Sequence, residues 1–132
     1  MNKRDILNKL FVENNLTDED VFKHQHYTII TRSGIEKIQA NLQIYCEYEV
    51  IKCEPNFAVV KAKAEITDKK FVQTFGSALK GNTFKDGNTT SWYVMEMAEK
   101  RAMSRAVLKL AGFYELGVFG EDESESFKRN NN

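Results

Sequence analysis

The stretch from residue 91 to residue 113, SWYVMEMAEKRAMSRAVLKLAGF, constrains the fold of this chain more than any other. Its alanines at positions 98, 102 and 106 recur every fourth residue, a spacing that places them on one face of a helix. Small side chains on that face allow the helix to lie close against a sheet. The stretch therefore predicts one long helix, capped by Ser91 and ended by Gly112.

A second row of side chains on this helix is basic. Arg101, Arg105 and Lys109 are also four residues apart and lie beside the alanines. Two interpretations stay open on helix spacing alone. The row is either the solvated edge of a core helix or a surface for an anionic partner.

A third side of the helix is apolar and carries Tyr93, Val94, Met97 and Leu108. A helix that is apolar on two sides is usually covered on both. A chain of 132 residues forms one small domain, which has little spare structure to cover the second side. We therefore expect a homo-oligomer, in which a second copy covers it.

Three strand-like segments precede the helix and are joined by short links. They are Ile44 to Cys53, Phe57 to Ile66 and Phe71 to Leu79, with Gly76 expected at a bulge of the last. Short links between alternating segments are typical of hairpins, so we expect an antiparallel meander. Two cysteines, Cys46 and Cys53, are expected to be reduced thiols on opposite faces of the first strand.

The N-terminal part is predicted to be mainly helical. We expect a helix over residues 2–14, a helical turn after Thr17, a short strand from His26 to Thr31, and a helix that Ser33 caps and that ends near Asn41. The predicted fold is thus α+β: a three-stranded antiparallel β-meander packed on one long C-terminal helix, with short N-terminal helices.

The predicted domain organisation is simple. Residues 1–120 are expected to form a single domain, and residues 121–132 a disordered acidic tail. The chain has no apolar run long enough to span a membrane, and its charged N-terminus does not resemble a signal peptide. We expect a cytoplasmic protein without a membrane partner.

Catalytic motifs are missing from the sequence. It contains no phosphate-binding loop, dinucleotide fingerprint, nucleophile elbow or paired-cysteine metal motif. His24 and His26 alone make a weak metal motif, and Glu47, Glu49 and Glu65 are more simply a solvated strand face. We expect no enzyme, no cofactor and no metal, although an unrecognised enzyme that uses these glutamates with a metal remains an alternative.

Binding chemistry is better represented. Residues 61–109 hold ten Lys and Arg against five acidic residues, although the whole chain has a net charge of zero. Lys61 and Lys63 share one strand face, and such charges can hold a phosphate backbone. Aromatic rings can stack on unpaired bases, and Phe84 and Tyr93, in or beside a glycine-bearing loop, are the candidates. Phe75 and Trp92 are expected in the core.

One phrase of the helix resembles a known family. The segment Ala98-Glu99-Lys100-Arg101-Ala102, followed by Arg105-Ala106 and Gly112, is similar to the helix of single-strand annealing proteins, the phage Erf-like and eukaryotic Rad fifty-two-like proteins. The upstream phrase Ile30 to Ile38 is also similar to a segment that precedes the sheet in phage members. The resemblance covers roughly Tyr27 to Phe113.

The resemblance implies a function. Members of this family bind single-stranded DNA in a basic groove, form rings or filaments, and anneal complementary strands without ATP. It places DNA contacts on Lys100 and Arg101, with Arg105 one turn on, and on the strand face of Lys61 and Lys63. We therefore expect single-stranded DNA binding and strand annealing in a protein of phage or mobile-element origin. A protein-interaction or inhibitor module with no nucleic-acid role is the alternative.

Overall fold

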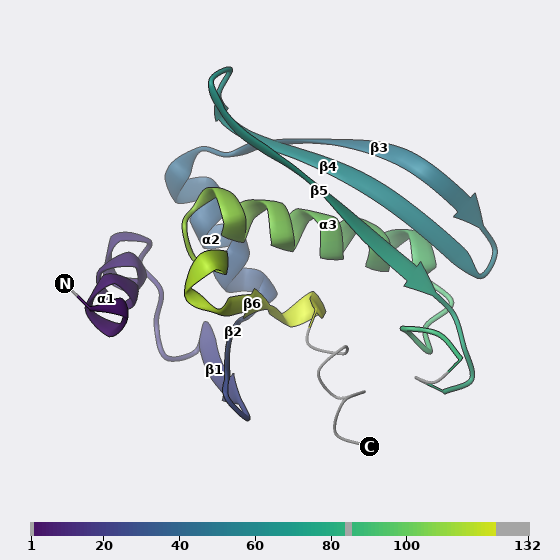
Figure 1. Ribbon diagram of the computed structural model, residues 1–132, viewed down its shortest axis with the longest axis horizontal. Coiled ribbons are helices and arrows are strands. Elements are labelled where there is room, and N and C mark those ends of the chain that lie inside the picture. The colour runs from purple at the N-terminus through teal and green to yellow at the C-terminus, as the bar shows by residue number, and fades with distance from the viewer. Residues whose placement is uncertain (1, 84–85, 124–132) are drawn as a thin grey trace.

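The computed structural model describes residues 2–83 and 86–123. The fold is α+β, with a long helix between a three-stranded sheet and a second layer of smaller elements (Figure 1). In chain order the elements are α1 (Lys3–Glu13), β1 (Val21–His24), β2 (Tyr27–Ile30), α2 (Arg32–Leu42), β3 (Tyr45–Glu54), β4 (Phe57–Thr67), β5 (Lys70–Leu79), α3 (Val94–Leu110), the 3-10 helix η1 (Tyr114–Leu116), β6 (Val118–Gly120) and the 3-10 helix η2 (Glu121–Glu123). None of the described helices is long and apolar enough to cross a bilayer.

The predicted meander is confirmed. Strands β3, β4 and β5 form an antiparallel sheet in that order, and α3 lies against one face of it (Figure 1). Every second residue of β4 from Ala58 to Ala64 is buried, whereas those between them are half-buried. The alternation of the sequence therefore separates a face covered by α3 from an open face.

The position of α3 depends on Gly76. A Cβ atom there would lie 2.5 Å from the amide nitrogen of Ala102, inside the helix backbone. Ala98 and Ala102 are fully buried at the same contact. The expected bulge at Gly76 is wrong, because Gly76 pairs in regular register with Val60. The glycine is needed for close helix–sheet approach and not for strand geometry.

Two bulges occur elsewhere in the sheet, between Val50 and Lys52 and between Glu65 and Thr67. The first corrects the expected placement of the cysteines. Cys46 pairs with Ala64 and Cys53 pairs with the buried Ala58, so the extra residue brings both cysteines to the face of the sheet that carries α3. Both are free thiols.

A second sheet was not predicted. Strand β1 pairs antiparallel with β2, and β6 pairs parallel with β2, where Thr28 faces Val118. A three-residue strand whose parallel partner lies far back in the chain leaves no periodicity to recognise. The expected helical turn after Thr17 is only a turn at residues 18–20, and β1 follows it directly.

The helix ends differ slightly from those predicted. Helix α2 is capped by Thr31, whose hydroxyl accepts a hydrogen bond from the amide of Gly34 at 3.1 Å, and not by Ser33. Helix α3 begins three residues after Ser91, whose hydroxyl instead accepts from the amide of Tyr93. Gly112 ends α3 with a φ of +87°, as expected.

The second apolar side of α3 is covered within one chain. Val94 and Leu108 are 4% and 0% exposed. Elements α2, β6 and η1 contact α3, and α2 and β6 lie on the side opposite the larger sheet (Figure 1). Tyr93, on the same side, is 70% exposed. The unpredicted second layer therefore covers part of this side within one chain, and the homo-oligomer stays a prediction.

The acidic segment after Gly120 is ordered at its start. Residues Glu121–Glu123 form η2, which contacts α3. This corrects the expected disorder for these three residues, and residues 124–132 of the predicted tail lie outside the described part of the chain.

We predict that Gly76→Ala destabilises the fold by ~1–3 kcal/mol or more, because the added methyl group must push the backbone of α3 away from β5. Urea unfolding of the purified variant measures this. Gln73→Ala is the matched control, since Gln73 is exposed on the same strand and faces away from α3. An unchanged unfolding midpoint for Gly76→Ala would show that the helix does not approach the strand so closely.

Candidate nucleic-acid interface

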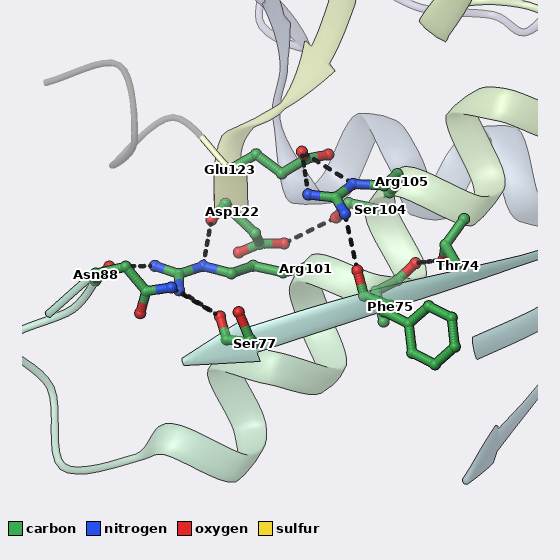
Figure 2. A network of polar contacts seen from close by, with 10 residues as sticks. Thr74, Phe75, Ser77, Asn88, Arg101, Ser104, Arg105, Asp122 and Glu123 are labelled. Carbon is green, nitrogen blue, oxygen red and sulfur yellow. Dashed lines mark hydrogen bonds and ion pairs between the residues drawn. The ribbon is translucent and has the colours of Figure 1, made fainter. Parts of the chain in front are cut away.

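Arg101 does not lie on a solvated edge. It is 5% exposed, and its guanidinium donates three hydrogen bonds to backbone carbonyl oxygens. Two of them reach Ser77 in β5 and Asn88 in the following loop, both at 2.8 Å, and the third reaches Asp122 at 3.2 Å (Figure 2). The predicted exposed position of Arg101 is therefore corrected, because the side chain is buried and three of its N–H groups bind backbone carbonyls.

Arg105, one turn further on, lies at the edge of the same cluster. It donates to the carbonyl oxygen of Phe75 at 2.8 Å and forms an ion pair with Glu123, whose Oε2 lies 3.2 Å from Nη2 (Figure 2). The Arg105 side chain is 35% exposed, so one side of the guanidinium faces solvent. Arg105 remains available to an anion that displaces or bypasses Glu123.

Glu123 is an unusual carboxylate. Burial raises the pKa of its carboxyl group, and the charge and hydrogen bonds of Arg105 offset this only in part. Its Oε1 is buried without a hydrogen-bond partner among the described residues, while Asp122 beside it accepts a hydrogen bond from Ser104 at 3.1 Å. The Glu123 carboxylate therefore helps to hold η2 on α3, although its burial disfavours the charged form.

A cavity of about 220 Å³ opens beside this cluster. Arg101, Arg105 and Glu123 line it, together with residues 75–77 of β5. It is polar and lies at the outer edge of the larger sheet, since β5 is an edge strand. Two guanidinium groups and one carboxylate thus line the cavity next to the Phe75 backbone.

The open face of the larger sheet carries exposed aromatic rings. Phe71 and Phe75 are 46% and 52% exposed, so the expected burial of Phe75 is wrong, as it is for Trp92 at 67%. The alternation of β5 explains this: its small residues Thr74, Gly76 and Ala78 face α3, which turns the phenylalanines outward. The alternation of small and aromatic residues in the sequence of β5 carries the signal for this outward position.

Lys61 and Lys63 share this open face with the rings. Lys61 pairs across strands with Phe75, and the ammonium of Lys63 lies 4.8 Å from the centre of the Phe71 ring. Lys61 also forms an ion pair of 3.0 Å with Glu49, and Lys63 pairs across strands with Glu47. The open face is therefore aromatic and balanced in charge, and less basic than the sequence predicts.

The remaining predicted contacts are scattered. Lys100 is half-buried on α3, which lies against the opposite face of the sheet from Lys61 and Lys63. Tyr93 is 70% exposed and directly precedes α3. Phe84 lies outside the described residues. The structure thus brings Lys61 and Lys63 together with Phe71 and Phe75, and places Arg105 behind Phe75.

A metal centre finds no support in the described part of the chain, where no three His, Cys, Asp or Glu side chains lie close enough to hold an ion. His24 ends β1 and His26 lies in the turn that follows it. Glu47, Glu49 and Glu65 lie on the open sheet face, where Glu49 is paired with Lys61.

We predict that Arg101→Met lowers stability by ~2–4 kcal/mol, because it keeps the bulk of the side chain but leaves buried carbonyl oxygens without a donor. Chemical unfolding followed by circular dichroism measures the loss. Lys100→Met, at the neighbouring half-buried position, is the control and is expected to change stability little. A stable Arg101→Met protein would mean that the three carbonyls are satisfied in another way.

The raised pKa of Glu123 predicts a pH dependence of stability. A carboxyl group whose pKa rises on folding stabilises the folded state below its unfolded pKa, ordinarily 4.5, and loses this contribution as the pH rises through its folded pKa. Relative to Glu123→Gln, the wild-type free energy of unfolding should therefore fall as the pH rises above about 4.5. Parallel pH profiles for the two proteins would contradict the assignment.

Comparison with known proteins adds no relative. No protein family matches the chain, and no curated protein or solved structure matches it either.

Proposed function

We propose that this protein binds single-stranded DNA on the open face of the larger sheet and, as the resemblance to annealing proteins implies, promotes the pairing of complementary strands. The observation that carries the proposal is the pair of exposed rings, Phe71 and Phe75, beside Lys61 and Lys63 on a face without a covering helix (Figure 1). Exposed aromatic rings next to cations are typical of single-strand binding surfaces.

Ring geometry favours an unpaired and extended strand. Phe71 and Phe75 are four residues apart on one strand, or ~13 Å at roughly 3.3 Å per residue. That separation exceeds the rise of a stacked base step several times over, so two bases that stack on both rings cannot be neighbours in a helix. The ring of Phe75 has no aromatic or cation contact among the described residues, which makes it the stronger of the two platforms.

Arg105 supplies a further phosphate contact at the edge of β5, besides Lys61 and Lys63 on the open face. It hydrogen-bonds the carbonyl oxygen of Phe75, so a base stacked on that ring brings its phosphate toward the half-exposed guanidinium. Glu123 already occupies part of the guanidinium, and a phosphate competes with it. η2 thereby weakens DNA binding in this proposal, and loss of the Glu123 charge strengthens it.

Charge balance on the open face determines how binding responds to salt. Lys61 is already paired with Glu49, so few condensed counterions are released when DNA binds. We therefore expect a shallow salt dependence, with a slope of about one to two, and affinity that comes chiefly from stacking.

We predict that Phe75→Ala with Phe71→Ala weakens binding to an oligothymidine of about 20 nucleotides by at least ~30-fold, because two stacks are lost and each costs ~1–3 kcal/mol. Fluorescence anisotropy of labelled DNA measures this, with duplex DNA of the same length as the comparison. Phe22→Ala is the matched control, since Phe22 is 39% exposed on β1, outside the larger sheet.

DNA binding by the folded Phe71→Ala, Phe75→Ala variant distinguishes single-stranded DNA binding from the alternative, a protein-interaction module. If it binds single strands as the wild type does, or if the wild type prefers duplex, the exposed rings belong to a protein-interaction module. Annealing is then tested separately, by fluorescence transfer between complementary labelled oligonucleotides without ATP. Faster pairing with wild type than with the double variant supports annealing.

A further inference from the structure

A second surface lies at the other end of the molecule, where α1 approaches the β1–β2 hairpin and the turn between η1 and β6. A groove of about 610 Å³ opens there. Its rim carries Lys3, Arg4, Lys23 and His26, and its floor includes Leu7, Val21 and Leu116. None of the residues that line it is acidic. Lys3 and Arg4 lie in α1 and Lys23 lies in β1, so no local sequence pattern joins these three cations.

The rim cations are not neutralised by neighbouring carboxylates of the described residues. Several described basic residues elsewhere are: Lys9 pairs with Glu13, Lys37 with Asp20 at 2.6 Å, Lys61 with Glu49 and Arg105 with Glu123. Lys3, Arg4 and Lys23 form no ion pair with any described residue. Unpaired cations around a groove that is lined by no acidic residue raise the local concentration of anions.

Two local features strengthen this positive field. Lys3 and Arg4 are the first two residues of α1, where the helix dipole adds positive potential. The ammonium of Lys3 lies 3.5 Å from where a Cβ of Gly117 would sit, so it reaches across to the opposite wall of the groove. The anionic groups of a ligand therefore find cations on both walls.

The floor shows what the rest of the ligand must be. Most of its apolar lining is aliphatic, and its one ring, Phe11, stacks on Phe113 with centroids 5.9 Å apart. A nucleobase would find at most one ring face to stack on, and a bare phosphate backbone would leave the apolar floor in water. Aliphatic or aromatic side chains fill such a floor and remove apolar surface from water.

We propose that this groove binds an acidic peptide segment of a partner protein, with apolar side chains on the floor and carboxylates at the cationic rim. The cations are spread over α1 and β1, which suits separated carboxylates better than one compact anion. The site lies apart from the open face of the larger sheet and does not depend on the function proposed there. Attraction between the rim cations and the peptide carboxylates speeds the first encounter, and the apolar side chains buried on the floor supply the affinity.

The test uses the full chain and a fluorescein-labelled peptide of about twelve residues in which Asp and Glu alternate with Leu and Phe. We expect micromolar binding by anisotropy. Lys3→Glu with Lys23→Glu should weaken it about tenfold or more, because both cations are reversed. Lys9→Glu is the matched control: it lies on the same helix, outside the groove, and should change affinity less than about twofold.

Two further arms make the outcome decisive. A peptide with Leu and Phe replaced by Ser should bind at least about tenfold more weakly; equal binding would mean a simple anion surface and overturn the proposal. Amide resonances of α1 and the β1–β2 hairpin should shift on titration with the first peptide, which tests the groove even if the double variant does not fold. Shifts with oligothymidine and none with peptide would assign the groove to nucleic acid instead. Phe71→Ala with Phe75→Ala should leave peptide binding unchanged.

Discussion

The close contact between α3 and β5 at Gly76 is the constraint on which the rest of this structure depends. Because Gly76 has no side chain, the backbone of α3 lies directly on the strand, where Ala98 and Ala102 are fully buried. Thr74, on the same face, donates a hydrogen bond to the carbonyl oxygen of Ala102. Small residues on both elements are what make this separation sterically possible.

The polar cluster at the edge of β5 follows from that contact. Once α3 lies so near the strand, the side chain of Arg101 reaches the carbonyl oxygens of the strand end, the following loop and η2 together. A cation in this position acts as a structural link between three segments. It also draws the acidic residues 121–123 onto the helix, where Glu123 pairs with Arg105. Arg101 and Arg105 of the basic row thus bind groups of the chain itself.

The two candidate surfaces differ in chemistry for the same reason. The open face of the larger sheet keeps its aromatic rings exposed but balances its lysines with glutamates from β3. The groove beside α1 gathers cations that have no such partners. A chain with no net charge therefore presents one exposed aromatic surface and one separate positive groove. The distribution of charge, and not its total, distinguishes the two.

The sequence by itself determined the elements whose signal is local. The alanine spacing indicated α3, the alternation of β4 indicated a strand with one buried face, and the short links indicated the meander. It also brought Lys61 and Lys63 to one face, because side-chain direction in a strand is fixed by backbone geometry. Only the tertiary structure decided which side chains are free. Arg101 is buried by carbonyls up to 24 residues away, β6 pairs with a strand about 90 residues earlier, and the open face is open because no described helix covers it (Figure 1). Such contacts join segments remote in the chain, and local periodicity carries no record of them.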